Sequence, residues 1–169
     1  MNEAVPRKIH IIGSVGSGKT TMAKRLSGEQ NIPFYELDNV VWIRNENGDI
    51  RRTPDERNAY LQHIILQDAW IVEGVHNEEW VNKSFENADV IYFIDTAVSV
   101  RTYRIIKRFI LQKLGLEKAN YQLTFKIFFK MFKWNKTFEK HKPAILQRLE
   151  LYGDKLVILR DNIRRDHDE

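Results

Sequence analysis

The residues best suited to do chemistry form one run near the start of the chain, where glycines alternate with small residues ahead of a lysine and a threonine. The run matches the phosphate-binding pattern G-x-x-x-x-G-K-S/T in full: Gly13, Ser14, Val15, Gly16, Ser17, Gly18, Lys19 and Thr20, with Thr21 directly behind it. Backbone N–H groups of such a turn close around a polyphosphate, the lysine reaches the β- and γ-phosphates, and the hydroxyl ligates Mg²⁺. This phosphate loop (residues 13–20) predicts a site for ATP or GTP with Mg²⁺, in which Thr20 is a metal ligand and Thr21 a further contact.

The segments on either side of the phosphate loop fit this interpretation. Residues 8–12 are a short, β-branched apolar run typical of a buried strand. Met22, Ala23 and Leu26 follow at helical spacing, within a helix expected over residues 20–27. The alternative is a glycine turn that only caps a core helix, but strand, loop and helix in this order are what the chemistry requires.

Strands and helices are expected to alternate along the whole chain, and three of the expected strands end in an acid. These acids are Asp38, Glu73 and Asp95. In a parallel sheet the carboxyl ends of the strands lie at the edge where the phosphate loop lies too. The three acids therefore predict metal and proton chemistry beside the γ-phosphate.

The remaining elements complete a sheet that is covered on both faces. Thr53, Pro54 and Glu56 form a capping box that starts a helix ending near residue 67. Further strands are expected over residues 34–37, 70–72, 90–94 and 156–159, and helices over residues 78–87 and 98–114. One or two helices are expected from residue 115 through residue 152, and Asp161 is expected to cap a short final helix. The alternation predicts one α/β domain over residues 1–169, a three-layer α/β/α P-loop NTPase with a five-stranded parallel sheet.

Composition limits the classes of protein to which the chain can belong. Its 169 residues include no cysteine, which excludes a disulfide framework and thiol chemistry and is typical of a reducing compartment. Residues 1–8 contain no apolar signal core, and no apolar run approaches the length of a membrane span. We therefore expect a cytoplasmic protein without a transmembrane segment.

The net charge of +4 hides a strong asymmetry along the chain. Residues 101–142 contain twelve lysines and arginines but two acids, a formal charge of +10, so that the rest of the chain carries −6. Six of the nine phenylalanines lie in the same segment. The segment therefore differs in character from the rest of the chain.

The phosphate loop and the strand ends resemble the nucleoside and nucleotide kinase branch of P-loop proteins, which has the adenylate kinase-like fold. Within that branch the chain is similar to the small bacterial DNA topology modulation protein family, which is described as kinases or ATPases. The similarity rests on the phosphate loop and on residues 36–42, 70–74 and 95–108. It implies a Mg·ATP-dependent phosphotransferase of the nucleoside or nucleotide kinase type.

The resemblance also implies roles for individual residues. Arg104 and Arg108, four residues apart on one helix face, would contact the transferring phosphates, with Arg101 as a further candidate. Asp38 would receive the proton of the acceptor hydroxyl or help to hold Mg²⁺. Glu73 would reach Mg²⁺ partly through water, although the family usually has aspartate at this position. The alternatives are a solvated basic helix face for the arginines and a helix cap for Asp38.

Several further residues have two interpretations each. His76 is either a surface loop histidine or an acceptor-site group, and Asp95 is either structural or near the metal. Arg44, Arg51 and Arg52 flank a turn where related kinases bind their second substrate, but we favour solvated loop charges.

The segment of residues 121–134 combines an aromatic stripe with a basic row at helical spacing: Phe125, Phe128, Phe129 and Phe132 beside Lys126, Lys130 and Lys133. In adenylate kinase-like enzymes this region closes over the nucleotide, so the resemblance implies that residues 101–142 form a basic helical lid within the domain. We favour packing of the stripe against a following helix over residues 143–151, with the lysines in water. The alternatives are binding of nucleic acid by charge and stacking, or contact with an anionic membrane surface.

The sequence as a whole favours a Mg·ATP-dependent kinase whose partners are a nucleotide and an unknown small-molecule phosphate acceptor. The three acids at strand ends favour this function. The alternative is an ATP-binding protein that hydrolyses ATP slowly and contacts nucleic acid through the basic lid, as the family name of DNA topology modulation suggests. The +10 segment favours that alternative.

Overall fold

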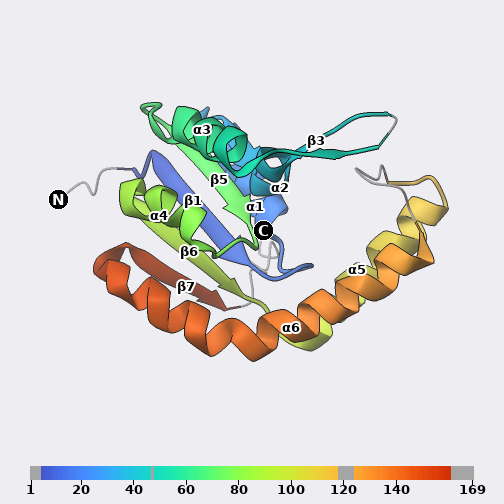
Figure 1. The fold of residues 1–169 in the computed structure, drawn as a ribbon. Coiled ribbons are helices and arrows are strands. Elements are labelled where there is room, and N and C mark those ends of the chain that lie inside the picture. The colour runs from blue at the N-terminus through green and yellow to red at the C-terminus, as the bar shows by residue number, and fades with distance from the viewer. Residues whose placement is uncertain (1–4, 47, 118–123, 161–169) are drawn as a thin grey trace.

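The computed structural model describes residues 5–46, 48–117 and 124–160 of the chain. Five parallel strands form one sheet in the order β2-β5-β1-β6-β7, which confirms the predicted α/β fold (Figure 1). The strands are β1 (Lys8–Gly13), β2 (Phe34–Glu36), β5 (Trp70–Gly74), β6 (Val90–Asp95) and β7 (Leu156–Arg160). Because β1 lies at the centre of the sheet, the phosphate loop that follows it in the sequence is flanked by the C-terminal ends of β5 and β6.

The helices occupy the segments between the strands. They are α1 (Lys19–Gln30), α2 (Leu37–Val41), α3 (Pro54–Ile65), η1 (Glu79–Val81), α4 (Asn82–Asn87), α5 (Val98–Lys113), α6 (Phe125–Leu149) and η2 (Glu150–Lys155). The predicted capping box is confirmed, since the Thr53 side chain and the Glu56 backbone and side chain bond reciprocally. The final helix expected behind Asp161 lies outside the described residues.

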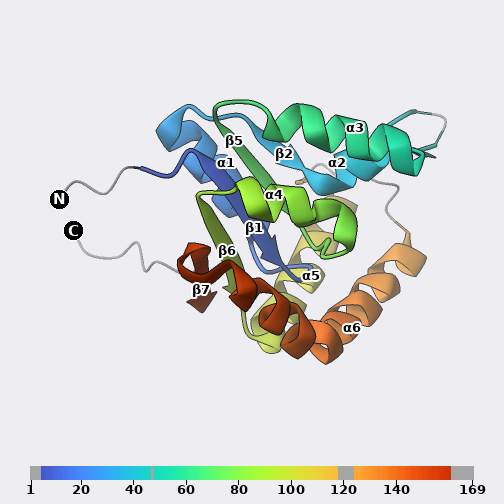
Figure 2. The same cartoon turned by 60° about the vertical axis from the view of Figure 1, so that its left-hand side comes forward.

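Helices cover both faces of the central strands, whose side chains point alternately to the two faces, while the edge strand β7 is partly exposed. Ile9 and Ile11 of β1 face α1, while Ile12 faces the larger core that α3, α4 and the end of α6 cover. Figure 2 shows α3 and α4 in front of the sheet and α1 behind it. Three layers therefore hold the strand ends in fixed positions around the phosphate loop.

Asp38 does not end a strand as predicted, because β2 stops at Glu36 and Asp38 lies in the first turn of α2. Leu37 is fully buried and packs on Gly74 at the end of β5. A Cβ at Gly74 would lie 2.9 Å from the Leu37 Cβ, so glycine permits this close packing. The close packing starts α2 early and holds Asp38 beside the end of β5.

Two further differences concern segments outside the sheet. The turn region after α2 contains a short antiparallel pair, β3 (Trp42–Ile43) and β4 (Ile50–Arg51), that the sequence did not predict. The expected packing of the aromatic stripe against a helix over residues 143–151 is wrong, because both segments belong to the single helix α6. Pro143 lies inside that helix without ending it, and Ile145 and Leu149, which follow it in the sequence, are buried in the core. Phe128 of the stripe packs against Phe109 of α5 instead, while Phe125 and Phe129 stay largely exposed.

No helix in the described part of the chain has both the length and the apolar character needed to cross a bilayer.

Candidate active site

The phosphate loop forms the turn between β1 and α1, as its pattern predicts. Gly16 has a φ of +76°, a left-handed conformation that favours glycine. A Cβ at this position would lie 2.9 Å from the Arg101 carbonyl oxygen on α5. Both backbone conformation and space therefore require glycine here, and the close contact joins the loop to α5.

Replacing Gly16 with alanine is expected to distort the phosphate loop and to weaken Mg·ATP binding by at least about tenfold, since a positive φ and a backbone contact both oppose a side chain. Gly28 provides the control, because it is exposed on α1 and has open space around it. Gly28→Ala should bind ATP like the wild type. Titration calorimetry with Mg·ATP on both variants measures the difference, and equal affinities would show that the loop does not hold the nucleotide.

Lys19 is buried inside the loop rather than extended into water. Its Nζ donates a hydrogen bond to the Ser14 carbonyl oxygen at 3.0 Å. Burial lowers the pKa of Lys19, while the nearby carboxylates of Glu73 and Asp38 oppose that shift. The ammonium group is thus held within the loop, within electrostatic reach of two acids of the candidate site.

Thr20 and Glu73 form the part of the site that fits Mg²⁺. The Thr20 hydroxyl donates to Glu73 Oε1 at 2.7 Å, and Glu73 is buried at the end of β5. Burial raises the pKa of Glu73, and Lys19 acts against that effect. No group of three or more His, Cys, Asp or Glu side chains in the described residues is placed to hold a metal ion. Two hard oxygens beside a phosphate loop match Mg²⁺, which usually takes few protein ligands together with phosphate oxygens and waters.

Asp38, His76 and Glu78 form a chain of charged groups. His76 Nε2 lies 3.2 Å from Asp38 Oδ1, and His76 Nδ1 lies 3.3 Å from Glu78 Oε2. Burial pushes the pKa of His76 down, but hydrogen bonds with both carboxylates raise it to about 9. The bond from His76 also lowers the pKa of Asp38. At neutral pH an imidazolium therefore orients an ionised Asp38 carboxylate, a contact that sequence reasoning missed.

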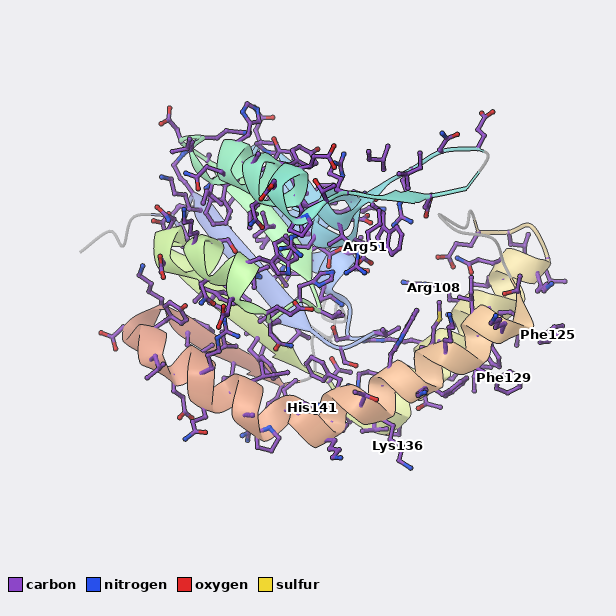
Figure 3. The ribbon with its side chains drawn as sticks, viewed as in Figure 1. Arg51, Arg108, Phe125, Phe129, Lys136 and His141 are labelled. Atoms are coloured by element: carbon purple, nitrogen blue, oxygen red, sulfur yellow. The ribbon has the colours of Figure 1, made fainter. Side chains whose placement is uncertain are left out.

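The arginines of α5 lie at different places around the loop. Arg104 Nη1 donates to the backbone oxygens of Gly16 at 3.3 Å and Ser17 at 3.0 Å. Arg108 is half exposed and lies 3.7 Å from Glu117. Figure 3 shows Arg108 on the side of α5 that faces the loop. Both arginines thus lie on the loop side of α5, where Arg104 supports the loop backbone directly.

Contacts from α5 and α6 hold the back of the site. Arg101 is buried and pairs with Glu139 of α6 at 2.5 Å, so its guanidinium has a structural partner. The Ser14 hydroxyl donates to Asn135 Oδ1 of α6 at 3.0 Å. Asp95 pairs with Lys142 of α6 at 2.5 Å, which supports the structural interpretation of this acid.

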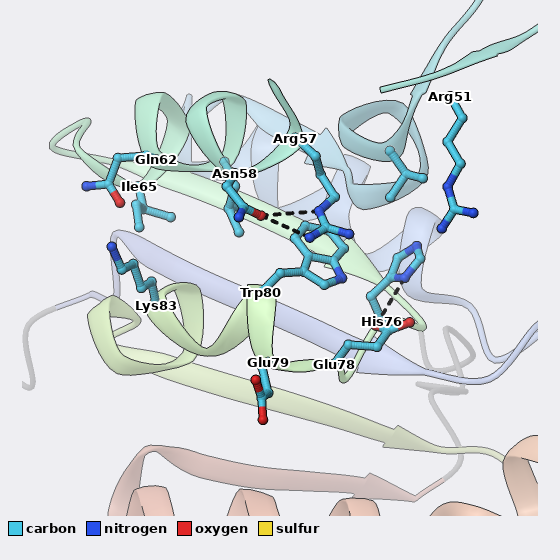
Figure 4. Close-up of a pocket in the computed structure, with 12 residues that line it drawn as sticks. Arg51, Arg57, Asn58, Gln62, Ile65, His76, Glu78, Glu79, Trp80 and Lys83 are labelled. Carbon is cyan, nitrogen blue, oxygen red and sulfur yellow. Dashed lines mark hydrogen bonds and ion pairs between the residues drawn. The ribbon is translucent and has the colours of Figure 1, made fainter. Parts of the chain in front are cut away.

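A cavity of about 730 Å³ opens beside this charged chain, with His76 and Glu78 in its wall (Figure 4). Helices α2, α3, η1 and α4 and strand β4 supply the rest of the lining. The Arg57 guanidinium lies 4.5 Å from the Trp80 ring centre and donates to Asn58. Such a volume is typical of sites for small molecules. The cavity is therefore a candidate acceptor site.

Only part of the expectation for the loop arginines holds. Arg51 is exposed, as a solvated loop charge would be, and it also lines the cavity. Arg44 pairs with Asp49 of the turn and donates to Asn39 of α2. Arg52 lies over Tyr60 and donates to the Asn39 carbonyl oxygen, so it holds α2 and α3 together.

Comparisons of the sequence and of the fold with known proteins indicate the family of the chain. No family model matches the chain. A shikimate kinase from Bacillus cytotoxicus is 30% identical over 129 residues, which cover 66% of this chain and 75% of that protein. The chain belongs to the shikimate kinase family. The predicted relationship to P-loop kinases is confirmed.

Solved structures of this family and of related kinases share the fold. The shikimate kinase of Bacteroides thetaiotaomicron matches with a TM-score of 0.59 at 18% identity, covering 96% of this chain and 91% of that one. A gluconokinase of Sinorhizobium meliloti matches with a TM-score of 0.50 at 16% identity, covering 95% and 86%. At these identities the structural likeness shows the fold alone. Shikimate kinase family members and the gluconokinase are nonetheless both named for small-molecule substrates.

Proposed function

We propose that this chain is an ATP-dependent phosphotransferase that transfers the γ-phosphoryl group to a hydroxyl of a small anionic acceptor. The observation that carries the proposal is the bond between Asp38 and His76 at 3.2 Å, because His76 lines the cavity. Asp38 also lies near enough to Lys19 of the phosphate loop for the charge of each group to shift the pKa of the other. A nucleotide in the loop and an acceptor in the cavity would then meet at Asp38.

Each group at this junction has a defined part in the reaction. Lys19 contacts the β- and γ-phosphates, and Thr20 and Glu73 hold the metal ion, directly or through water. Mg²⁺, when bound, supplies positive charge that neutralises the phosphate oxygens. Asp38 orients the attacking hydroxyl and accepts its proton.

The arginines of α5 complete the reaction site. Arg104 keeps the loop backbone in place through its bonds to Gly16 and Ser17. Arg108 stabilises charge on the transferred group, since a guanidinium forks onto phosphate oxygens.

The lining of the cavity indicates the class of acceptor. Arg51, Arg57 and Lys83 contribute three cations against the two acids Glu78 and Glu79, and Leu61 and Trp80 contribute apolar surface. This combination suits a compact carbon skeleton that bears a carboxylate and several hydroxyls. The names of the relatives point to shikimate and gluconate, both hydroxylated carboxylic acids, so we propose an acceptor of that chemical class.

A screen of hydroxylated carboxylic acids tests this proposal. We expect shikimate, gluconate or a relative to stimulate ADP release from Mg·ATP. Arg57→Ala should then raise the acceptor KM by about tenfold to a hundredfold, the loss of one charged hydrogen bond, and leave the ATP KM unchanged. Arg25→Ala is the control, because Arg25 lies on α1 in an exposed pair with Glu29. An Arg57→Ala enzyme with an unchanged acceptor KM would rule out this cavity as the acceptor site.

The second candidate is the nucleic-acid-associated ATPase. The +10 charge of residues 101–142 favours it, but the large cavity beside Asp38 has no part in it. We therefore propose the kinase, and a cytoplasmic location for it stays a prediction.

A further inference from the structure

Helices α5 and α6 form a hairpin, and large apolar side chains are exposed to solvent on its outer face. On α5, Ile106, Ile110 and Leu114 follow at intervals of four residues, and Ile110 is 50% exposed. On α6, Phe125 and Phe129 are 63% and 66% exposed. Side chains four residues apart lie on one helix face, so each helix presents an apolar stripe to solvent.

Contacts between the two helices place both stripes on the same side. Phe109 of α5 lies 4.3 Å from Phe128 and 5.4 Å from Phe125 of α6, measured between ring centres. Lys113 Nζ of α5 reaches over the exposed Phe125 ring at 5.3 Å. Figure 3 shows Phe125, Phe129 and Lys136 on the side of the hairpin away from Arg108. The outer face therefore points away from the candidate active site.

Positive charge surrounds these apolar side chains. Neither α5 nor residues 125–138 of α6 contain an acid. Lys126, Lys133 and Lys136 are exposed, and no carboxylate among the described residues pairs with them. The outer face thus combines exposed lysines that pair with no described carboxylate and apolar side chains that are exposed to solvent.

We propose that the outer face of the α5–α6 hairpin docks on an anionic lipid bilayer. Phe125, Phe129 and Ile110 enter the boundary between headgroups and acyl chains, and the lysines contact the anionic headgroups. A second copy of the chain is a poor partner, because two faces of the same charge repel. Nucleic acid offers bases for the phenylalanines to stack on, but no apolar surface for Ile106, Ile110 and Leu114.

Co-sedimentation with vesicles tests this proposal on the full chain. Vesicles of phosphatidylcholine with roughly a third phosphatidylserine should retain the protein, and vesicles of phosphatidylcholine alone should not. Raising the salt concentration should release it, since salt screens the attraction. Equal retention on both kinds of vesicle, or none on the anionic ones, would overturn the proposal.

Two sets of variants separate the apolar from the charged contribution. Phe125→Ser with Phe129→Ser, and separately Lys126→Glu with Lys133→Glu and Lys136→Glu, should each weaken vesicle binding by more than about tenfold. The matched controls, Leu66→Ser with Leu151→Ser and Lys24→Glu, change exposed residues elsewhere and should bind like the wild type. Circular dichroism checks folding, and the lysine set keeps the test valid if the phenylalanine set unfolds.

Two further outcomes would assign the face to another partner. If light scattering shows a concentration-dependent dimer that the phenylalanine variant abolishes, the partner of this face is a second copy of the chain and not a bilayer. If fluorescence anisotropy shows DNA or RNA binding that is tighter than vesicle binding and is lost in the lysine variant, the partner is nucleic acid. Either result would overturn the proposal.

Discussion

Replacing Lys19 with alanine is expected to lower phosphotransfer by about a hundredfold to a thousandfold, the typical cost of removing one donor aimed at developing charge. Lys19 is held inside the phosphate loop by a 3.0 Å bond to the Ser14 carbonyl oxygen. Its ammonium group is the cation placed to reach the β- and γ-phosphates. Lys24→Ala, an exposed lysine of the same helix, is the matched control and should retain full activity.

The melting temperature of the Lys19→Ala variant distinguishes a loss of catalysis from a loss of folding. Lys19 is buried, and its alanine variant loses the hydrogen bond to the Ser14 carbonyl oxygen, so the melting temperature is measured beside the activity. A melting temperature close to that of the wild type assigns the loss of activity to the missing ammonium group. Calorimetry that found unchanged Mg·ATP affinity together with unchanged turnover would remove the nucleotide site from the phosphate loop.

Replacing Asp38 with asparagine is expected to lower kcat by about a hundredfold to ten-thousandfold while ATP affinity changes little, since the lost group acts on the acceptor rather than on the nucleotide. Asparagine keeps the size of the side chain and removes its negative charge. Asp38 is bonded to His76, which lines the cavity, and this bond holds the carboxylate in place.

Binding and turnover must be measured separately for this variant. Calorimetry gives the Mg·ATP affinity, and a steady-state assay with the acceptor gives kcat. Asp55→Asn, an exposed acid in the first turn of α3, is the control and should behave like the wild type. Full turnover in Asp38→Asn would leave Asp38 as a helix-end acid with no part in proton transfer.

Sequence reasoning worked best where the determinants are local. The phosphate loop needs a left-handed glycine at Gly16, and the capping box needs only Thr53 and Glu56, three residues apart. Short apolar runs likewise predicted five strands, whose observed ends differ from the predicted ends by one or two residues. Such features depend on backbone conformation and on neighbours along the chain, which a sequence displays directly.

The parts that sequence reasoning missed depend on contacts between distant segments. His76 bonds to Asp38 across 38 positions, and Ser14 bonds to Asn135 across 121 positions. No local pattern encodes either pair. Arg51 lines the cavity while Arg52, the next residue, binds the backbone of α2, because the short strand β4 and its turn set their directions.

The aromatic stripe shows a different reason for failure. Pro143 suggested a boundary between two helices, which would have allowed the stripe to fold back on the second one. In the structure α6 continues through Pro143 because the buried residues behind it hold the helix on the core. The phenylalanines consequently extend beyond the core and pair with α5.

The destination of the γ-phosphoryl group tests the central claim most directly. ATP labelled in the γ-phosphate is mixed with the wild-type enzyme, Mg²⁺ and the acceptor identified by the screen, and the labelled products are separated. The account predicts that the label appears on the acceptor, in amounts equal to the ADP formed, with little free phosphate. Label found only in inorganic phosphate, whichever hydroxylated acid is supplied, would contradict the account and favour the nucleic-acid-associated ATPase.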